Sequence, residues 1–365
     1  MPVIRTALAA YGLSGKIFHA PFLLAHPAFE LVAIVERNRH DAAELFVGDE
    51  PAYEQAPAPQ RVQSYEALLL DKSLDLIVVN TPSGLHYEMV TQALNAGKHV
   101  VVEKPFTATW QQAKTLITLA KEKKLMLSVY HNRRLESGFL TVQKLLAAGT
   151  LGAITQYRTC VDRYRPQLGI KRWKEEVNPA AGLLYDFGSH LVDEILQLFG
   201  RPQSISADIF SQRQWLKKDV SECALAPDYF VLRCYYNNVH GQFCAELRAS
   251  MVALAATPHY ILHGSQGSYV KAIGDIQEAA LQSGKRPNTA SWCVESRADW
   301  GQLHRPEGVE DYPSVMGCYQ NFYHNIAEVL KHGADLQVQP EQAAEVIELL
   351  EVAQRSASEG RIIEL

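Results

Sequence analysis

The sequence contains no long hydrophobic run. No apolar stretch approaches the roughly 20 residues that a membrane-spanning helix requires. The first residues also show none of the charged, apolar and cleavage regions of a secretory signal peptide. We therefore expect a cytoplasmic protein with no membrane partner.

Cysteine is scarce and scattered. The six cysteines show neither a CxxC pair nor any other spacing typical of a metal site. Without a secretory signal they are expected to be reduced thiols, mostly in the core. The pattern predicts neither a disulfide framework nor a metal site.

An excess of basic charge is also missing. The chain has 35 Lys and Arg against 40 Asp and Glu, and a formal net charge of −5. General nucleic-acid binders normally carry a basic excess, so we expect no nucleic-acid partner. With 47% hydrophobic and 21% charged residues, the composition is that of a soluble globular protein.

The length of 365 residues exceeds the size at which one hydrophobic core stops growing, so two domains are expected. In the first domain, short apolar runs alternate with two helical patterns. The runs that predict strands occupy 4–10, 31–35, 74–80, 99–102 and 125–129, and the helices occupy 87–96 and 110–123. This alternation favours an α/β domain with a doubly wound parallel sheet over residues 1–130.

The pattern changes after residue 130. Alternating apolar positions at 230–236 and 243–251 predict two strands, joined by a turn at Asn237 and Asn238. A further helix is predicted to begin at Pro340. Residues 131–365 are therefore expected to form an α+β domain with a mostly antiparallel open sheet, whose terminal helix packs back on the first domain.

The first predicted strand leads into the segment AYGLSGKIFHAPF. Gly12 and Gly15 have the spacing of the later part of a dinucleotide-binding fingerprint, in which the backbone approaches a pyrophosphate as a helix begins. Ala10 stands where the first glycine is expected. An ordinary strand-to-helix turn looks the same, so this loop, which includes Leu13 and Ser14, is a candidate phosphate site that needs support from its context.

That support comes from the end of the second predicted strand. Glu36 lies 21 residues beyond Gly15 (from position 15 to position 36), where an acidic residue binds the adenosine ribose. Its carboxylate would repel a 2′-phosphate and so favours NAD. Arg37 could instead pair with that phosphate or stack on adenine, which leaves NADP as the alternative. We favour NAD.

The segment AAGLLYDFGSHLVDEILQLFG at 180–200 predicts an amphipathic helix that ends at Gly200. Asp186 and His190 lie one turn apart and project to the same side. The stripe continues with Asp193 and Gln197, which we interpret as the solvated face of a surface helix. A histidine beside a carboxylate suits the removal of a hydroxyl proton during alcohol oxidation, although a plain surface helix gives the same pattern.

The stretch KHVVVEKPF at 98–106 ends a buried strand with Glu103, Lys104 and Pro105. Charged residues are rarely buried unless they are paired or take part in function. The sequence around this strand therefore indicates a functional turn.

Several stretches together resemble the glucose–fructose oxidoreductase/inositol dehydrogenase family (Gfo/Idh/MocA), in its branch with scyllo-inositol dehydrogenases. The matching stretches are AYGLSGKIFHAPF, VVNTPSGLH, GKHVVVEKPF, YHNRR, GLLYDFGSHLVDEILQLFG and the terminal PEQAAEVIELLEVAQRSASEGRIIEL. The resemblance covers essentially the whole chain. Two departures are Ala10 and Ala181, which replaces the first of two glycines usual before the catalytic helix.

The resemblance implies an NAD(P)-dependent oxidoreductase in which hydride passes between nicotinamide and a secondary hydroxyl or ketone of a sugar or cyclitol. Its first domain is a Rossmann domain, and its second binds substrate and mediates assembly into a homodimer or homotetramer. By this match His190 takes the hydroxyl proton, Asp186 positions and tunes it, and Lys104 binds the reacting oxygen. Alternatives are an NAD-assisted elimination or hydrolysis of a glycoside, and a sugar- or nucleotide-sensing regulator.

The resemblance also implies further site residues. Glu103 would help to fix the cofactor, and the Lys104–Pro105 peptide bond is predicted to be cis. The remaining implied residues fall into three groups: Thr81, Pro82 and His86 beside the dinucleotide; Asn132 and Arg133 near the nicotinamide and substrate; and Tyr164, Trp173 and Tyr319 at the substrate wall. Each of these last three could equally belong to the core or to a dimer contact.

Overall fold

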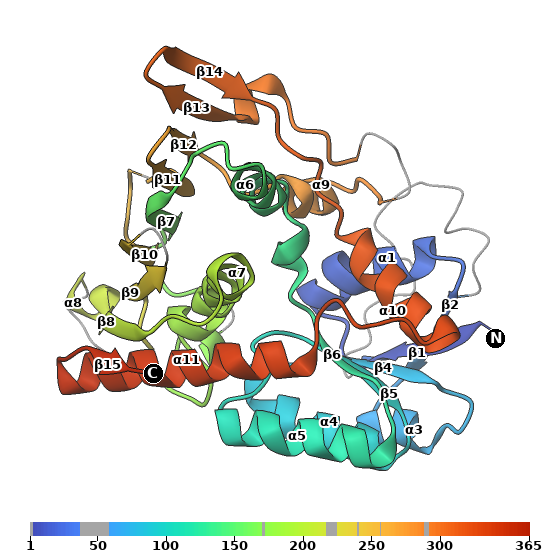
Figure 1. The fold of residues 1–365 in the computed structure, drawn as a ribbon. Coiled ribbons are helices and arrows are strands. Elements are labelled where there is room, and N and C mark those ends of the chain that lie inside the picture. Colours follow the sequence, from blue (N-terminus) through green and yellow to red (C-terminus); the bar gives the residue numbers. More distant parts are fainter. Residues whose placement is uncertain are drawn as a thin grey trace.

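The computed structural model describes residues 3–36, 58–169, 172–216, 225–238, 241–255, 257–287 and 292–365. Within these residues the strands form a six-stranded and a nine-stranded sheet. Figure 1 shows the two sheets side by side, with the long helix α11 (Pro340–Glu359) running from the first towards the second.

The first sheet is built from short, almost wholly buried strands. They are β1 (Ile4–Leu8), β2 (Phe29–Val35), β3 (Gln60–Val62), β4 (Leu76–Val79), β5 (His99–Val102) and β6 (Leu127–Val129). Their order is β3-β2-β1-β4-β5-β6, and all neighbours are parallel. The chain order changes direction between β1 and β4, and sheets of this kind bind ligands beyond the carboxyl ends of the strands at such a switch point.

Helices cover both faces of this sheet, which explains why its strands are apolar on both sides. One face packs against α3 (Tyr65–Leu70), α4 (His86–Asn95) and α5 (Trp110–Lys123), and the other against α1 (Ala20–Ala25) and α10 (Gln320–His332). Alternate valines of β5 divide between the two layers: Val100 and Val102 face the first, and Val101 faces the second.

The second sheet is mostly antiparallel. Its strands are β7 (Ile154–Asp162), β8 (Ser204–Phe210), β9 (Tyr229–Asn238), β10 (Gly241–Ser250), β11 (Tyr260–Gly264), β12 (Ser268–Lys271), β13 (Gly301–Arg305), β14 (Gly308–Tyr312) and β15 (Ile363–Glu364). Their order is β14-β13-β12-β11-β7-β10-β9-β8-β15, in which only β7 and β10 run parallel.

The helices of the second half lie on the side of this sheet that faces the first domain (Figure 1). They are α6 (Ser137–Ala147), α7 (Ser189–Phe199), α9 (Gln277–Gln282) and α11, with a short α8 (Gln212–Leu216) at one end. A turn of π-helix at Leu184–Gly188 leads directly into α7. Helix α11 contacts α5 of the first domain as well as α7 and β8 of the second, so the terminal helix does pack back on the first domain.

Most predicted elements agree with the structure, and the fold class is as expected. The strand at 99–102 and the helix at 110–123 have the predicted bounds, and α11 begins at Pro340. The predicted turn at Asn237 and Asn238 is wrong, because β9 continues through both residues and Asn238 pairs with Gly241 of β10. Among the residues that the structure describes, no helix combines the length and apolar character needed to cross a lipid bilayer.

Candidate active site

Lys104 follows β5 at the carboxyl end of the first sheet, and its peptide bond to Pro105 is cis, as predicted. Its ammonium donates hydrogen bonds of 2.8 Å to both the backbone carbonyl and the Oδ1 atom of Asp186, which lies 82 residues further along the chain. The ammonium predicted from one domain therefore meets the carboxylate predicted from the other.

A second lysine joins this pair. Lys174, in a 3₁₀ turn at Arg172–Lys174, places its Nζ atom 2.8 Å from Oδ1 of Asp186. Burial alone would raise the pKa of Asp186, but the two ammonium groups outweigh it and hold that pKa well below its usual value. Two of the three ammonium donors of Lys104 are used on Asp186, which leaves a third for a ligand.

His190 is buried one turn beyond Asp186. Burial, and then the positive charges of Lys104 and Arg133, hold the pKa of His190 well below its usual value. The imidazole is therefore neutral and able to accept a proton. Its Nδ1 atom is buried and has no hydrogen-bond partner among the described residues.

Asp186 was predicted to position and tune His190. The helical spacing puts both side chains on one side, as expected. The carboxylate nevertheless binds Lys104 and Lys174, because two cations attract it more strongly than a neutral imidazole does. The hydrogen bonds of Asp186 therefore go to the lysines, while its negative charge acts to raise the pKa of His190.

Two guanidinium groups flank the ring of Phe187, the residue after Asp186. The Cζ atom of Arg163 lies 4.6 Å from the ring centroid, and that of Arg133 lies 5.4 Å from it. Arg133 is also held by Glu136, with its Nε atom 3.4 Å from Oε1. The Lys104–Asp186 pair thus lies in electropositive surroundings, which suit oxygen-rich ligands.

The glycine loop has the two properties that a bound pyrophosphate requires. A Cβ atom on Gly12 would meet nothing within 4 Å, so the backbone there is open to a ligand, whereas one on Gly15 would lie 2.6 Å from the carbonyl oxygen of Ala10. Gly15 is therefore needed for close packing. Asn80 fixes the backbone at Ala10, where the first glycine was expected: its side chain accepts from the Ala10 amide at 3.0 Å and donates to the Ala10 carbonyl at 2.8 Å.

Glu103 ties this loop to the end of β5. It accepts hydrogen bonds from the Ser14 hydroxyl and from the backbone amide of Lys104, and its Oε1 atom lies 3.0 Å from Nε2 of His19. Nδ1 of His19 in turn lies 2.8 Å from the Tyr323 hydroxyl. Burial raises the pKa of Glu103, but these partners outweigh it and lower that pKa to about 2. Glu103 thus fixes the loop that would hold the cofactor.

The Asn-Thr-Pro loop lies beside this region, with Thr81 and Pro82 half-buried. His86, predicted beside the dinucleotide, lies behind this loop. It is buried, and its two ring nitrogens lie 2.8 Å from the Pro105 carbonyl and 3.0 Å from the Thr81 carbonyl. A carbonyl oxygen faces each ring nitrogen, and the neutral ring donates to one of them, so His86 packs between the two loops with both nitrogens covered.

Glu36 directly follows β2 and pairs with Arg61 of β3, at 3.0 Å between Oε2 and Nη1. The carboxylate predicted to bind ribose is therefore already paired with a cation. Arg37, the predicted alternative contact, lies outside the described residues.

The remaining predicted residues are dispersed. Leu13 is exposed in the glycine loop, and Asn132 is buried in the 3₁₀ turn Asn132–Leu135. Tyr164 is 55% exposed, and Trp173 is half-buried next to Lys174. Tyr319, the third residue predicted at the substrate wall or in the core, is buried in this structure. It is 2% exposed, and its hydroxyl donates to Oε1 of Glu136 at 2.8 Å.

The interpretation of Asp193 as part of a solvated helix face is also wrong. Asp193 is buried and receives two hydrogen bonds from Arg134, of 2.8 Å from Nε and 2.6 Å from Nη2. Arg134 also donates to the side chain of Gln342 at the start of α11. Periodicity correctly put Asp193 on the stripe of Asp186, but it could not reveal that another segment covers this part of the stripe.

Sequence reasoning also missed Lys174 and Asn80. Asn80 lies inside a recognised motif, at the carboxyl end of the strand that neighbours β1, and this position was a usable signal. Lys174 lies in an irregular loop with no periodic pattern, so the sequence offered none.

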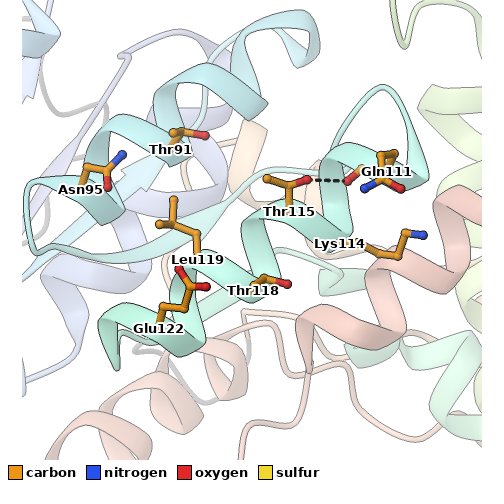
Figure 2. A pocket seen from close by; sticks show the side chains of 8 residues that line it. All are labelled: Thr91, Asn95, Gln111, Lys114, Thr115, Thr118, Leu119 and Glu122. Atoms are coloured by element: carbon orange, nitrogen blue, oxygen red, sulfur yellow. Dashed lines mark hydrogen bonds between the residues drawn. The ribbon is translucent and has the colours of Figure 1, made fainter.

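A surface groove between α4 and α5 is unrelated to this site. Figure 2 shows its lining of short polar and charged side chains, including Thr91, Lys114 and Glu122. The Thr115 hydroxyl bonds the Gln111 carbonyl within its own helix. The groove contains none of the predicted site residues, and we assign it no function.

The first domain and its glycine loop define a dinucleotide-binding oxidoreductase. Residues 4–131 match the family description "Oxidoreductase family, NAD-binding Rossmann fold", and residues 143–365 match "Oxidoreductase family, C-terminal alpha/beta domain". The chain therefore belongs to the Gfo/Idh/MocA family.

Known proteins similar to this chain agree with that assignment. Scyllo-inositol 2-dehydrogenase (NADP⁺) IolW of Bacillus subtilis is 37% identical over 99% of this chain and 96% of its own length. The uncharacterised oxidoreductase YdgJ of Escherichia coli is 37% identical over 97% and 96%. The solved structure of the putative oxidoreductase yvaA from Bacillus subtilis superposes with a TM-score of 0.88 at 37% identity, covering 100% of this chain and 99% of that one. The chain is thus an NAD(P)-dependent oxidoreductase.

Proposed function

We propose that the enzyme moves hydride between a nicotinamide cofactor and a secondary hydroxyl or ketone of a sugar or cyclitol. The observation that carries the proposal is the meeting of Lys104 and Asp186, next to a neutral His190, at the carboxyl end of the dinucleotide-binding sheet. The similar inositol dehydrogenase of Bacillus subtilis and a D-xylose 1-dehydrogenase (NADP⁺) of Hypocrea jecorina, 33% identical over 38% of this chain, support the substrate class.

The residues present fit a dinucleotide. The open backbone at Gly12 and the amides that follow it would hold the pyrophosphate, Glu36 would face the adenosine ribose, and Glu103 would hold the loop in place through Ser14. When bound, nicotinamide supplies the hydride acceptor and donor. The protein's part is to orient the substrate carbon and to manage the proton of its hydroxyl.

His190 and Lys104 have separate roles: His190 transfers the hydroxyl proton, and Lys104 binds the oxygen. The neutral imidazole of His190 accepts the hydroxyl proton as the carbon is oxidised, and returns it in the reverse direction. The third ammonium donor of Lys104 binds the substrate oxygen and stabilises its developing negative charge. Asp186 holds Lys104 in place through two hydrogen bonds and keeps its ammonium charged. Burial lowers the pKa of Lys104, and Asp186 opposes that lowering.

We propose NAD as the preferred cofactor, because the Glu36 carboxylate would repel a 2′-phosphate. Two observations favour NADP instead: Arg61 neutralises that carboxylate, and the Bacillus subtilis relative is named as NADP⁺-dependent. The ratio of kcat/KM for the two cofactors decides between them. A clear preference for NADP would reject our choice, and Glu36→Gln should shift the ratio towards NADP.

The test of the proposed function is a spectrophotometric screen. Purified enzyme is incubated with inositols and aldoses plus oxidised cofactor, and with their ketones or lactones plus reduced cofactor. A substrate-dependent change in reduced nicotinamide absorbance supports a dehydrogenase. Product formation with no net change in that absorbance would instead indicate transient oxidation followed by elimination or hydrolysis. Binding without turnover would indicate a sensor.

We further propose a homodimer or homotetramer formed through the outer face of the nine-stranded sheet, in the cytoplasm. That face carries ion-paired polar residues such as Arg158 and Glu246, at 3.1 Å, which suit an interface of mixed character. Light scattering after size-exclusion chromatography measures the assembly state. A monomer at micromolar concentration would contradict this part of the proposal.

A further inference from the structure

Three buried polar side chains converge around one face of α7 and take no part in the chemistry described above. Glu136 begins α6, Glu194 lies on α7 one turn beyond His190, and His259 precedes β11. Each offers one donor atom, and these atoms all lie within 4.8 Å of one another. The exposed fractions of these residues are 4%, 0% and 8%.

Each of the three side chains is held by a contact to a neighbouring protein group. Oε2 of Glu194 accepts from the Tyr157 hydroxyl at 3.3 Å, and Oε1 of Glu136 accepts from the Tyr319 hydroxyl at 2.8 Å. The His259 ring bonds the backbone of Cys160. Metal ligands are held in this way, with one atom on a protein group and the other on the ion.

Two of the remaining atoms have no well-placed partner. Oε1 of Glu194 and Nε2 of His259 are buried without a hydrogen bond of good geometry among the described residues, and the Tyr260 hydroxyl is a nearby protein donor to the Glu194 carboxylate. When the His259 nitrogen that bonds the Cys160 backbone carries the ring proton, Nε2 presents a lone pair. An unsatisfied buried carboxylate oxygen and an unsatisfied imidazole nitrogen are both costly, and a cation between them would satisfy both at once.

We propose that Glu136, Glu194 and His259 bind a divalent transition-metal ion, such as Zn²⁺ or Mn²⁺, that ties α6, α7 and β11 together beneath the active site. One imidazole and two carboxylates form a donor set that suits these ions. Donor atoms of a tetrahedral ion at about 2.1 Å lie about 3.4 Å from one another, which the spacing of the cluster allows. The site is structural, and it is independent of the proposed substrate.

Arg133 makes an alternative to a bound ion possible, in which a proton balances the remaining charge of the cluster. Its guanidinium pairs with Glu136 at 3.4 Å and therefore balances one of the two carboxylates. A single proton on the other carboxylate would complete the charge balance without an ion. That proton would satisfy Glu194 or His259 but would not link them, because no hydrogen bond joins these two residues. The metal-bound and the protonated states of the cluster differ in the metal content of the purified protein and in its response to added metal.

The test uses the full-length enzyme, purified without a metal-affinity column or chelator. Elemental analysis by mass spectrometry should find about one ion per chain. Chelation should lower Tm, and added Zn²⁺ or Mn²⁺ should restore it. Glu194→Gln, which keeps the shape of the side chain, should lose the ion and the Tm response. Glu246→Gln, which changes a carboxylate on the outer face of β10, should keep both.

Wild-type enzyme with less than about one ion per ten chains, and with no change in Tm on addition of either metal, overturns the proposal. An equal metal response in wild type and Glu194→Gln also overturns it, because the ion would then bind elsewhere. If Glu194→Gln does not fold, the wild-type metal content and Tm response still decide the question.

Discussion

Two successive parts of one helical segment carry similar side chains in different surroundings. At its beginning, the side chains of Asp186, Lys104 and Lys174 are 25%, 16% and 35% exposed. One to two turns further on, the side chain of Asp193 is 3% exposed and its partner Arg134 is 10% exposed. The first group can therefore be reached by a small molecule, whereas the second joins α7 to the start of α11.

Because of this difference, Asp186 should affect mainly the reaction and Asp193 mainly the stability of the fold. A carboxylate that holds a lysine near a ligand contributes to the reaction through the position of that lysine. A sealed carboxylate–guanidinium pair contributes mainly when one partner is lost, because the other is then buried without compensation. Variants at the two ends of the segment should therefore affect different measurements.

The largest effect on activity is expected at the beginning of the segment, where Lys104 and Asp186 are accessible to a small molecule. Lys104→Ala removes the donor to the substrate oxygen and should lower kcat by about 10²–10³-fold, the usual cost of losing one such donor. Cofactor binding, followed by quenching of protein fluorescence, should change little. Because Lys104 repels a proton from His190, its loss should also raise the pKa of His190 and move the acidic limb of kcat/KM to higher pH. Turnover close to wild type would contradict the proposed mechanism.

At the buried pair of Asp193 and Arg134, Arg134→Ala should destabilise the protein. Its loss of activity per folded molecule should be smaller than that of Lys104→Ala. Asp193 would lose both of its bonds to Arg134 while remaining buried, which costs about 3–5 kcal/mol. Urea unfolding measures the change in the free energy of unfolding. The matched control is Lys121→Ala, which breaks the exposed pair between α5 and α11 at Glu341, 2.7 Å long, and should cost less than about 1 kcal/mol. An equal loss in the free energy of unfolding for the two variants would show that the buried pair contributes no more than the exposed one.

Much of this contrast could not be predicted from the sequence. Buried β-branched runs predicted β5, and the helical period at 110–123 predicted α5. Periodicity also put Asp186 and Asp193 on one stripe. It gives the direction of a side chain but not the segment that covers it, so Asp193 was expected to be solvated.

The convergence of Lys104 with Asp186 came from family resemblance rather than from pattern, because no local rule joins residues 82 positions apart. Segments with a weak sequence pattern were not predicted, because a local pattern was missing there as well. Strand β14 has mostly exposed side chains and therefore no apolar alternation to detect. Lys174 lies in an irregular loop and was missed as well.

Acid should affect Glu103, the carboxylate that links the glycine loop to β5. Its pKa is lowered from 4.5 to about 2, so its stabilisation is complete above about pH 4.5 and is lost as pH falls towards 2. About 2 kcal/mol of this contribution should be gone at pH 3. Urea unfolding at pH 6 and pH 3 should therefore show a smaller difference for Glu103→Gln than for wild type. Identical differences would mean that Glu103 is not the titrating group.

The smallest effect is expected at Lys174, which shares Oδ1 of Asp186 with Lys104. Lys174→Ala leaves both bonds from Lys104 to Asp186 in place, and its side chain is more exposed than that of Lys104, so solvent screens more of its charge. We expect kcat to fall by about tenfold or less, with unchanged stability. Steady-state kinetics beside Lys104→Ala provide the comparison. If both variants lost activity equally, Asp186 would need the two ammonium groups together to keep its position, and the reaction would depend on the whole triad rather than on Lys104 as the single donor.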